Sequence, residues 1–480
     1  MGKDLVHVLL VSFPAQGHIN PLLRLARLLA SKGLLVTFST TEAIAHRMQK
    51  ATNTFASSDG PPTVVGDGQL RFDFFSDGWA IDDSQRDDII ALMDHLKSVC
   101  PTTFADLIKR QAVQGRPVTH VINNPFLPWA LDVAAEMGIP CGVLWVQSCA
   151  VFSTYYHYFH KLAKFPTPSE PSIDVQLPSM PLLTTDDLPS FLLPDTPYSC
   201  LTDAILGQFK NISKASWVLV ESFEELEPGI LQSLSSHVSL LTIGPLFKWL
   251  QQEAADFVRG DIWKAADCVE WLDSQQPSSV VYVSFGSVIE LSQEQMEEIA
   301  WGLRNSRRPF LWVVRGWDDP SQAKLPKGYL EEIEGQGKVV QWSPQDLVLA
   351  HPAMGCFMTH CGWNSSMEAI CCGVPVITFP QWGDQVTNAK FMTDVYGIGL
   401  RLGFREGGPL VKREDMEKCV EEIMGEGPKA KEIRSRCLTW KETAEKAVGH
   451  GGSSHVNVQT VMDDVRRSAG ELNPPIENSH

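Results

Sequence analysis

Short apolar runs alternate with amphipathic stretches along most of this chain. The apolar runs predict strands at residues 6–12, 34–39, 119–123, 141–146, 280–284, 310–314, 339–341, 356–359 and 376–379. Helical periodicity begins at Pro21 and ends before Gly33, and it returns at residues 129–137. Ser292 and Gln295 form a capping box, which predicts the start of a further helix. This alternation indicates an α/β fold with doubly wound parallel sheets that helices cover on both faces.

The length of the chain, 480 residues, is too great for one hydrophobic core and fits two domains. We predict an N-terminal domain at residues 1–245 and a C-terminal domain at residues 267–455. Residues 246–266 lack a clear period, and we interpret them as the linker between the domains. Residues 165–197 are rich in Pro, Ser and Asp, which predicts a long surface loop of the kind that shapes a binding pocket.

The charge balance disfavours one large class of function. The chain has 57 acidic and 40 basic residues, a net charge of −17, and no long basic run, whereas nucleic-acid binding needs a positive surface. No apolar run reaches the length of about 18 residues that a membrane span needs. The short apolar run near the N-terminus leads directly into residues 14–18, without the longer core and cleavage site of a signal peptide. We therefore expect a cytosolic protein that is not inserted in a membrane.

Eleven cysteines, an odd number without a C-x-x-C pair, predict reduced and mostly buried thiols. One group in the second half could be mistaken for a metal site: Cys356, His360, Cys361, Cys371 and Cys372. Its spacing matches no zinc pattern, because the residues would spread over a strand, a turn and a helix end. The sequence therefore predicts no metal site.

Residues 342–385 form the most informative segment. A buried strand at 356–359 leads into the polar turn 360–363, and a helix then begins at Asn364 and stops at Gly373. The N-terminus of such a helix offers backbone N–H groups and the positive end of the helix dipole to an anion.

The first turns of this helix carry the polar side chains that suit a nucleotide. Asn364 and Ser365 supply amide and hydroxyl donors for phosphate oxygens. Glu368 lies four residues after Asn364 on the same face, and its carboxylate suits a pair of ribose hydroxyls. The strand, turn and helix together therefore predict a cradle for a nucleoside diphosphate.

The segment from Trp342 to Gln385 closely resembles, without a gap, the signature box of plant family-1 UDP-glycosyltransferases. The resemblance implies the GT-B fold, in which two Rossmann-like domains face each other across a cleft. It also implies a role for each of these residues: Trp342 stacks on uracil, Gln345 lies beside the nucleoside, His360, Asn364 and Ser365 hold the diphosphate, Glu368 binds the ribose, and Asp384 and Gln385 bind the sugar hydroxyls.

The resemblance adds detail about the donor. The family tends to carry Trp at position 363, after Gly362, and Gln at position 385 when the donor is UDP-glucose. Gly286 and Ser287 match the family's Gly-Ser contact with the diphosphate, although the motif by itself indicates only a tight turn. Residues 456–480 resemble the family's closing segment, a C-terminal helix that returns to the first domain, followed by a tail that we expect to be disordered.

His18 is the candidate base of the first domain. It is predicted to lie in the turn after the first strand, before a helix that Asn20 and Pro21 begin, at the sheet edge where α/β proteins bind ligands. By itself such a histidine is more often a polar turn residue that caps the helix. The segment from Phe13 to Pro21 resembles the family's first motif, which implies that His18 deprotonates the acceptor.

Asn124 departs from the family pattern. Most members carry an aspartate at this position, behind the histidine, and an amide cannot stabilise a charged imidazole as an anion does. A phenol has a pKa near about 10 and depends on a strong base, whereas a carboxylic acid, near about 4, is already ionised at neutral pH. We therefore hypothesise that the acceptor is a carboxylate and the product is a glucose ester.

Four further segments resemble the subgroup that makes acyl-glucoses: residues 74–79, 123–129, 144–149 and 379–384. Its members esterify hydroxycinnamic and benzoic acids, limonoids and auxin, and some also glucosylate phenols. The side chains that we predict to line the acceptor pocket are Phe126, Gln147, Ser148 and Trp382.

The sequence thus predicts an inverting UDP-glucose-dependent glucosyltransferase that acts on a small aromatic plant metabolite, as a monomer and without a cofactor. Transfer to flavonoid or other phenolic hydroxyls, or to carbon, stays open, as does a nucleotide-sugar binder without transferase activity, or an epimerase, on the same fold. A nicotinamide oxidoreductase is disfavoured because Leu402 replaces the last glycine of its motif after Gly397 and Gly399. A serine hydrolase is disfavoured because G-x-S-x-G is absent.

Overall fold

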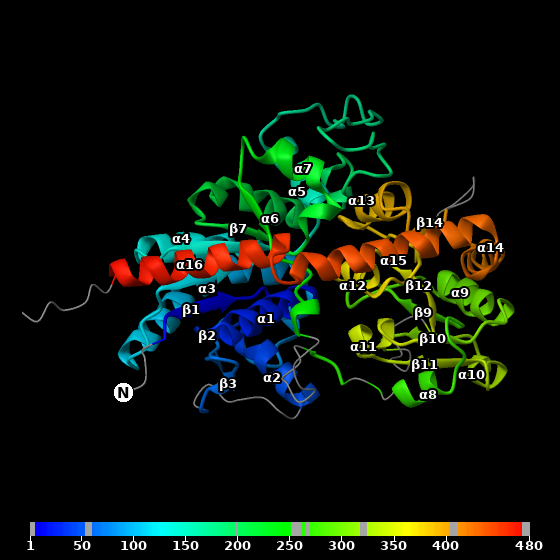
Figure 1. Ribbon diagram of the computed structural model, residues 1–480, viewed down its shortest axis with the longest axis horizontal. Coiled ribbons are helices and arrows are strands. Elements are labelled where there is room, and N and C mark those ends of the chain that lie inside the picture. The colour runs from blue at the N-terminus through cyan, green and yellow to red at the C-terminus, as the bar shows by residue number, and fades with distance from the viewer. Residues whose placement is uncertain are drawn as a thin grey trace, which may run out of the picture. The chain divides into compact units, whose positions relative to one another are not determined.

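The computed structural model describes residues 5–52, 60–197, 199–250, 261–264, 266, 268–316, 324–403 and 410–472 (Figure 1). Their contacts divide the chain into two compact units. The first unit comprises the described residues of 1–162, 196–263 and 446–480, and the second those of 163–195 and 264–445. Most of the predicted linker and the end of the predicted tail lie outside the described residues. The predicted domain limits stay a prediction.

The first unit contains an eight-stranded sheet in the order β3-β4-β2-β1-β5-β6-β7-β8. Its strands are β1 His7–Val11, β2 Leu35–Ser39, β3 Thr63–Val65, β4 Gly68–Phe72, β5 His120–Asn123, β6 Cys141–Trp145, β7 Val218–Val220 and β8 Leu240–Thr242. Its helices are α1 Gln16–Ser31, α2 Glu42–Thr52, α3 Ile89–Val113, α4 Pro128–Glu136, α5 Cys149–Phe159, α6 Ser199–Gly207, α7 Pro228–Leu234 and α16 Ser453–Leu472. All neighbouring strands are parallel except β3 and β4, a hairpin that the sequence reading missed.

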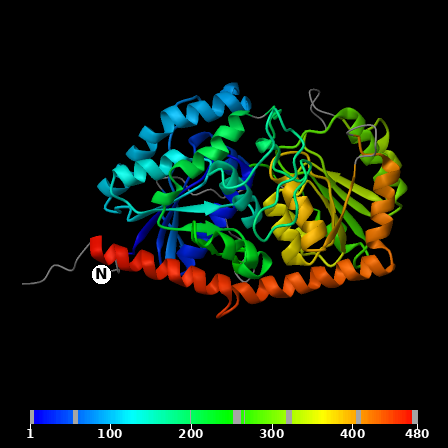
Figure 2. The same ribbon diagram turned by 90° about the horizontal axis from the view of Figure 1, so that it is seen from above.

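Successive residues of β1 enter two different hydrophobic cores. Val8 and Leu10 pack with α1 and with α16, whereas Leu9 and Val11 pack with α3 and α4. Figure 2 shows α3 in light blue and α16 in red on opposite sides of this sheet. Since both faces are covered, the strand is buried at every position and is apolar after His7, and the predicted doubly wound architecture is confirmed for this unit.

Helix α1 begins earlier than the sequence reading predicted. It starts at Gln16, so that Pro21 lies inside the helix and not at its first position. The proline lacks the N–H of one helical hydrogen bond, but the other hydrogen bonds of the helix still form and its apolar face is still buried. As a consequence, His18 lies in the first turn of α1 and not in the turn before it, which corrects the predicted position.

The second unit contains a six-stranded, entirely parallel sheet in the order β11-β10-β9-β12-β13-β14. Its strands are β9 Val280–Ser284, β10 Phe310–Val313, β11 Gly337–Val340, β12 Met354–Thr359, β13 Val376–Thr378 and β14 Gly399–Arg401. Its helices are α8 Val269–Asp273, α9 Gln293–Asn305, α10 Tyr329–Glu332, α11 Gln345–Leu349, α12 Trp363–Cys372, α13 Gln385–Lys390, α14 Arg413–Met424 and most of α15 Pro428–Val448. This strand order is that of the dinucleotide-binding Rossmann fold.

The helix signals read from the sequence of the second unit are largely confirmed. The Ser292 hydroxyl accepts from the Gln295 N–H at 3.2 Å and caps α9. The other half of the predicted capping box is absent, because the Gln295 amide pairs with the main chain of Val411 at 2.9 and 3.0 Å. Gly373 ends α12 in the left-handed conformation, with φ of 73°.

Residues 163–195 group with the second unit, although they precede it in sequence. As predicted for residues 165–197, the segment has little regular structure, apart from the 3-10 turn Ser190–Leu192. It is nevertheless anchored by buried apolar side chains, namely Val175, Leu177, Leu183, Leu188, Phe191 and Leu192. The predicted surface loop is therefore partly a buried strap.

A buried histidine makes the first unit sensitive to acid. The ring of His7, on β1, is bonded to the Thr37 hydroxyl at 2.8 Å and to the Arg116 carbonyl at 2.9 Å. Burial lowers the pKa of His7 from 6.5 to about 4. Between those two values the unfolded chain binds the proton and the folded chain does not, so stability falls as the pH falls.

We expect His7 alone to lower the free energy of unfolding by about 3 kcal/mol between pH 7 and pH 4. Urea titrations across this range check the value, and the pH dependence should shrink by that amount in His7→Gln. An equal pH dependence in His7→Gln and the unaltered protein would contradict this account.

Candidate active site

Each sheet has a switch point between two neighbouring strands. The strands that come before and after this point in the chain extend the sheet in opposite directions. In the second unit this point lies between β9 and β12, and in the first it lies between β1 and β5. Ligands of open α/β sheets bind at the carboxyl ends of such strands. Gly286 and His360 follow β9 and β12, and His18 and Asn124 follow β1 and β5, so these predicted residues lie at the switch points.

In the second unit, two glycines enclose the His360 ring. Gly286 has φ of 74°, and a Cβ there would lie 2.7 Å from His360 Nε2. A Cβ at Gly362 would overlap the same nitrogen from another direction. Burial lowers the pKa of His360 to about 4, so the ring is uncharged at neutral pH. The ring thus occupies a fixed place beside the N-terminus of α12, where Gly362 is the N-cap.

A hydrogen-bond network joins α11 to α12. The Gln345 amide donates to the Ser365 hydroxyl and to the Glu368 carboxylate, both at 2.8 Å. The Tyr282 hydroxyl donates to the Gln345 carbonyl at 3.2 Å and contacts the Ser343 hydroxyl at 2.9 Å. Glu368 is only 5% exposed, so the network fixes the direction of a buried carboxylate. Tyr282 lies on the buried strand β9, and sequence reasoning missed its role.

Asp384 and Gln385 lie at the start of α13. The Asn388 amide donates to the Asp384 carboxylate at 2.8 Å and to the Cys361 carbonyl at 3.0 Å, which ties this helix to the turn before α12. The Gln385 carbonyl accepts from the main chain of Gln381 at 3.0 Å. Sequence reasoning missed Asn388, although its position four residues after Asp384 on a helix was a usable signal.

The remaining predicted donor residues also lie in the second unit. Trp363 is buried, whereas Ser287, Trp342 and Asn364 are half-buried. A cavity of about 390 Å³ opens at the ends of β9 and β10, and its lining includes Phe285, Gly286, Glu290, Trp312 and Arg315. Of the predicted donor residues, only Gly286 lines it.

In the first unit, His18 is packed between two aromatic rings. The ring centroids of Phe13 and Phe126 lie 5.1 and 4.7 Å from that of His18, both in edge-to-face geometry. Asn124 is fully buried behind them, and its side-chain carbonyl accepts from the Phe126 N–H at 3.2 Å. Sequence reasoning singled out His18, Asn124 and Phe126, and the structure brings all three together.

Burial controls the charge of His18. It lowers the pKa of this residue to about 4, and a weaker side-chain interaction with Asn124 opposes the shift. Within the described part of the chain, neither His18 Nδ1 nor Asn124 Nδ2 has a hydrogen-bond partner of standard geometry. The amide therefore supplies no negative charge to the ring, which is neutral at neutral pH.

The other predicted acceptor residues are divided between the two units. Ser148 is 2% exposed, and its hydroxyl caps α5 by accepting from the Val151 N–H at 3.1 Å. Gln147 is half-buried at the end of β6. Trp382 belongs to the second unit and packs against Phe191, with ring centroids 5.5 Å apart.

All eleven cysteines are free, and eight are buried. Among the described residues, no group of three or more His, Cys, Asp or Glu side chains is arranged to hold a metal ion. None of the described helices is both long and apolar enough to cross a membrane.

Comparison with known proteins gives consistent matches along the chain. The family described as "UDP-glucoronosyl and UDP-glucosyl transferase" matches residues 264–434, and "Glycosyltransferase, N-terminal domain" matches residues 4–59. A gallate 1-beta-glucosyltransferase of Punica granatum is 51% identical over 100% of this chain and 94% of its own length. A cinnamate beta-D-glucosyltransferase of Fragaria ananassa is 47% identical over 98% and 85%. The crystal structure of Os79 from O. sativa with UDP has a TM-score of 0.83 at 32% identity, over 96% of this chain and all of Os79.

Proposed function

This chain belongs to the UDP-glucuronosyl and UDP-glucosyl transferase family, and from that premise we propose that it transfers glucose from UDP-glucose to the carboxylate of a small aromatic acid. As a member of the family it is a UDP-glycosyltransferase with the GT-B fold. The products of the proposed reaction are UDP and a glucose ester. We further propose that it acts as a cytosolic monomer without a metal cofactor.

The acceptors of two similar enzymes support a carboxylate as the group that receives glucose. Gallate and cinnamate, which name two of the similar enzymes, are both aromatic carboxylic acids. Cinnamate has no hydroxyl group, so its carboxylate is its one nucleophilic oxygen group. UDP-glucose is an α-glycoside and both enzymes are named for β-glucosyl transfer, which supports an inverting attack on the anomeric carbon.

The single observation that carries the proposal is the amide of Asn124 beside a neutral His18. A base with a pKa of about 4 cannot hold a proton taken from a phenol, whose pKa is near about 10. A carboxylate arrives already ionised and needs no such base. The ring of His18 then orients the acceptor, and an N–H of the neutral ring is able to donate to the carboxylate.

For the donor, we propose the roles that the family resemblance implies. Trp342 stacks on the uracil, and Glu368, directed by Gln345, binds the ribose hydroxyls. Asn364 and the N-terminus of α12 stabilise the diphosphate as negative charge develops on it, without reorganisation at the moment of reaction. His360, Ser365 and the turn at Gly286 and Ser287 complete the diphosphate contacts. Asp384 and Gln385 bind the glucose.

A panel of acceptors tests the proposal. The protein is incubated with UDP-glucose and either cinnamate, benzoate or a flavonoid without a carboxyl group, and both UDP release and product mass are measured. We expect glucosides of the two acids, and alkaline hydrolysis should return each free acid, as it does for an ester. Faster turnover of the flavonoid would instead favour phenolic transfer, and UDP binding without UDP release for any acceptor would favour a nucleotide-sugar binder.

A further inference from the structure

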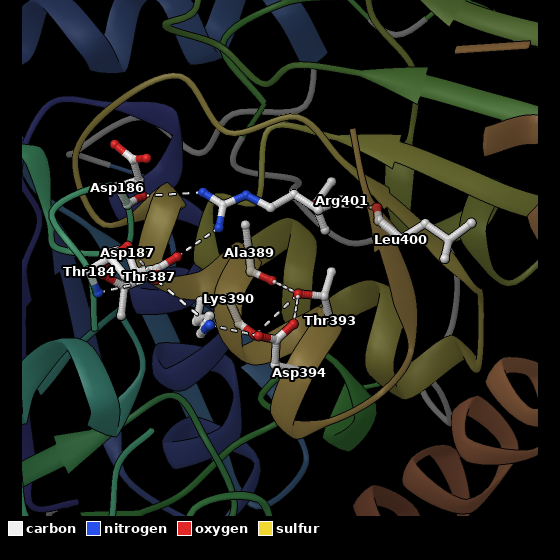
Figure 3. Close-up of polar contacts among 11 residues, drawn as sticks. Thr184, Asp186, Asp187, Thr387, Ala389, Lys390, Thr393, Asp394, Leu400 and Arg401 are labelled. Carbon is white, nitrogen blue, oxygen red and sulfur yellow. Dashed lines mark hydrogen bonds and ion pairs between the residues drawn. The ribbon is translucent and has the colours of Figure 1, made fainter. Parts of the chain in front are cut away.

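Asp187, on the strap formed by residues 163–195, is a buried carboxylate at the centre of a polar cluster in the second unit (Figure 3). Its carboxylate accepts from Arg401 Nη1 at 2.7 Å and from the Thr184 hydroxyl at 2.9 Å, and it lies 3.8 Å from Lys390 Nζ. Its main-chain carbonyl accepts from the Thr387 hydroxyl at 2.6 Å. Asp187 is only 3% exposed, and this set of partners therefore binds the strap firmly to α13 and to the end of β14.

Three residues after Asp187, the strap meets the turn before α13. The Ser190 hydroxyl accepts from the Gly383 N–H at 2.7 Å, and the Ser190 N–H donates to the Gly383 carbonyl at 3.2 Å. Gly383 has φ of 67°, and a Cβ there would lie 3.1 Å from the Phe191 ring. Phe191 also packs against Trp382. Both polar groups of the Gly383 main chain are thus paired with one residue of the strap.

This turn leads directly to the two residues assigned to the sugar. Asp384 follows Gly383, and Gln385 begins α13, which also carries Thr387 and Lys390. The strap therefore contacts α13 at its first turn and at its end. Any shift of the Gly383 peptide moves the main chain of Asp384, because the two residues are adjacent.

We propose that Asp187 and Ser190 are positioning residues for the donor sugar, which hold the turn at 382–385 so that Asp384 and Gln385 meet the hydroxyls of glucose. The inference rests on the proposed function, since it takes the sugar-binding role of those two residues as given. It assigns to the strap, which lies far from the signature box in sequence, a part in the choice and binding of the sugar. The inference does not involve the uridine roles proposed for Trp342 and Glu368.

The test separates the sugar from the nucleotide. Asp187→Asn and Ser190→Ala are assayed for the KM of UDP-glucose and for the inhibition constant of UDP, which lacks the sugar. We expect the KM for UDP-glucose to rise about tenfold in each variant, while the inhibition constant of UDP changes by less than about twofold. Ser190→Thr retains the hydroxyl and should restore the KM. The ratio of activity with UDP-glucose to that with UDP-galactose should fall in the first two variants.

Matched controls come from the exposed part of the same strap. Asp174→Asn removes a charge and Ser172→Ala removes a hydroxyl at exposed positions, and both should leave the KM and the inhibition constant unchanged. Equal rises of the KM for UDP-glucose and of the inhibition constant for UDP in Asp187→Asn would show a general loss of structure and overturn the inference. So would an unchanged KM in both Asp187→Asn and Ser190→Ala.

Asp384→Asn distinguishes this inference from the proposed function. If Asp384→Asn raises the KM for UDP-glucose and the strap variants do not, the inference is wrong and the sugar role of Asp384 stands. If Asp384→Asn leaves that KM unchanged, the proposed sugar site is wrong and the inference falls with it.

Discussion

Asn124→Asp is expected to raise the rate of glucosylation of a simple phenol by about a hundredfold, without raising the rate for cinnamate. A carboxylate at this position would face the buried His18, whose pKa is now lowered to about 4. The negative charge would favour the charged imidazole and so raise the pKa of His18 toward the value that a general base needs. A phenol gains from that base, whereas an ionised carboxylic acid does not.

The two acceptors are measured on one enzyme preparation, so the cinnamate rate is the internal control for folding and donor binding. The pH profile of the phenol reaction should also acquire an ionisation near neutral pH in the variant. If Asn124→Asp abolished ester formation and left phenol transfer unchanged, the explanation offered for Asn124 would be wrong. Asn124→Ala should not increase phenol transfer, because it adds no charge.

Gly362→Ala is expected to lower kcat/KM for UDP-glucose by about a hundredfold. The added methyl group would overlap His360 Nε2. The ring also lies close to Gly286, since a Cβ built there would be 2.7 Å from the same nitrogen, so it cannot move far in that direction. The ring must therefore rotate out of its place beside α12, which would change the shape of the proposed diphosphate site. Both the KM for UDP-glucose and the inhibition constant of UDP should rise, in contrast to the strap variants.

Gly403→Ala is the matched control in the same unit, because a Cβ at Gly403 would meet nothing within 4 Å. It should keep the activity and the melting temperature of the unaltered protein. A Gly362→Ala variant with normal UDP binding would mean that His360 does not contribute to the diphosphate site.

The local structure of the proposed nucleotide site was predictable because its residues lie in one continuous segment. Strand β12, the turn at His360 and helix α12 follow each other without interruption. The end of α12 is also readable locally, because Gly373 readily adopts the left-handed conformation that ends a helix. The parallel sheets were predictable for a similar reason, since strands such as β1 and β9 are buried at every position and consist mainly of apolar residues.

What the sequence could not show depends on contacts between distant residues. Asp187 and Arg401 are far apart in the chain, and no local pattern indicates that the strap at 163–195 packs on the second unit. Tyr282 resembles any core residue of a buried strand until its hydroxyl is seen beside Gln345. Pro21 predicts too late a start for α1, because proline favours the first turn of a helix, whereas the buried face of α1 already begins at Gln16 and Ile19.

The central claim is that glucose is transferred to a carboxylate because Asn124 leaves His18 a poor base. Para-hydroxycinnamate carries a carboxylate and a phenol in the same molecule. The two acceptor groups are therefore compared without a difference in the size of the acceptor. The most direct measurement is the position of glucose on this acceptor after reaction with UDP-glucose, read by NMR and by alkaline hydrolysis. The account predicts the glucose ester, which alkali returns to the free acid. An alkali-stable phenolic glucoside as the main product would contradict it.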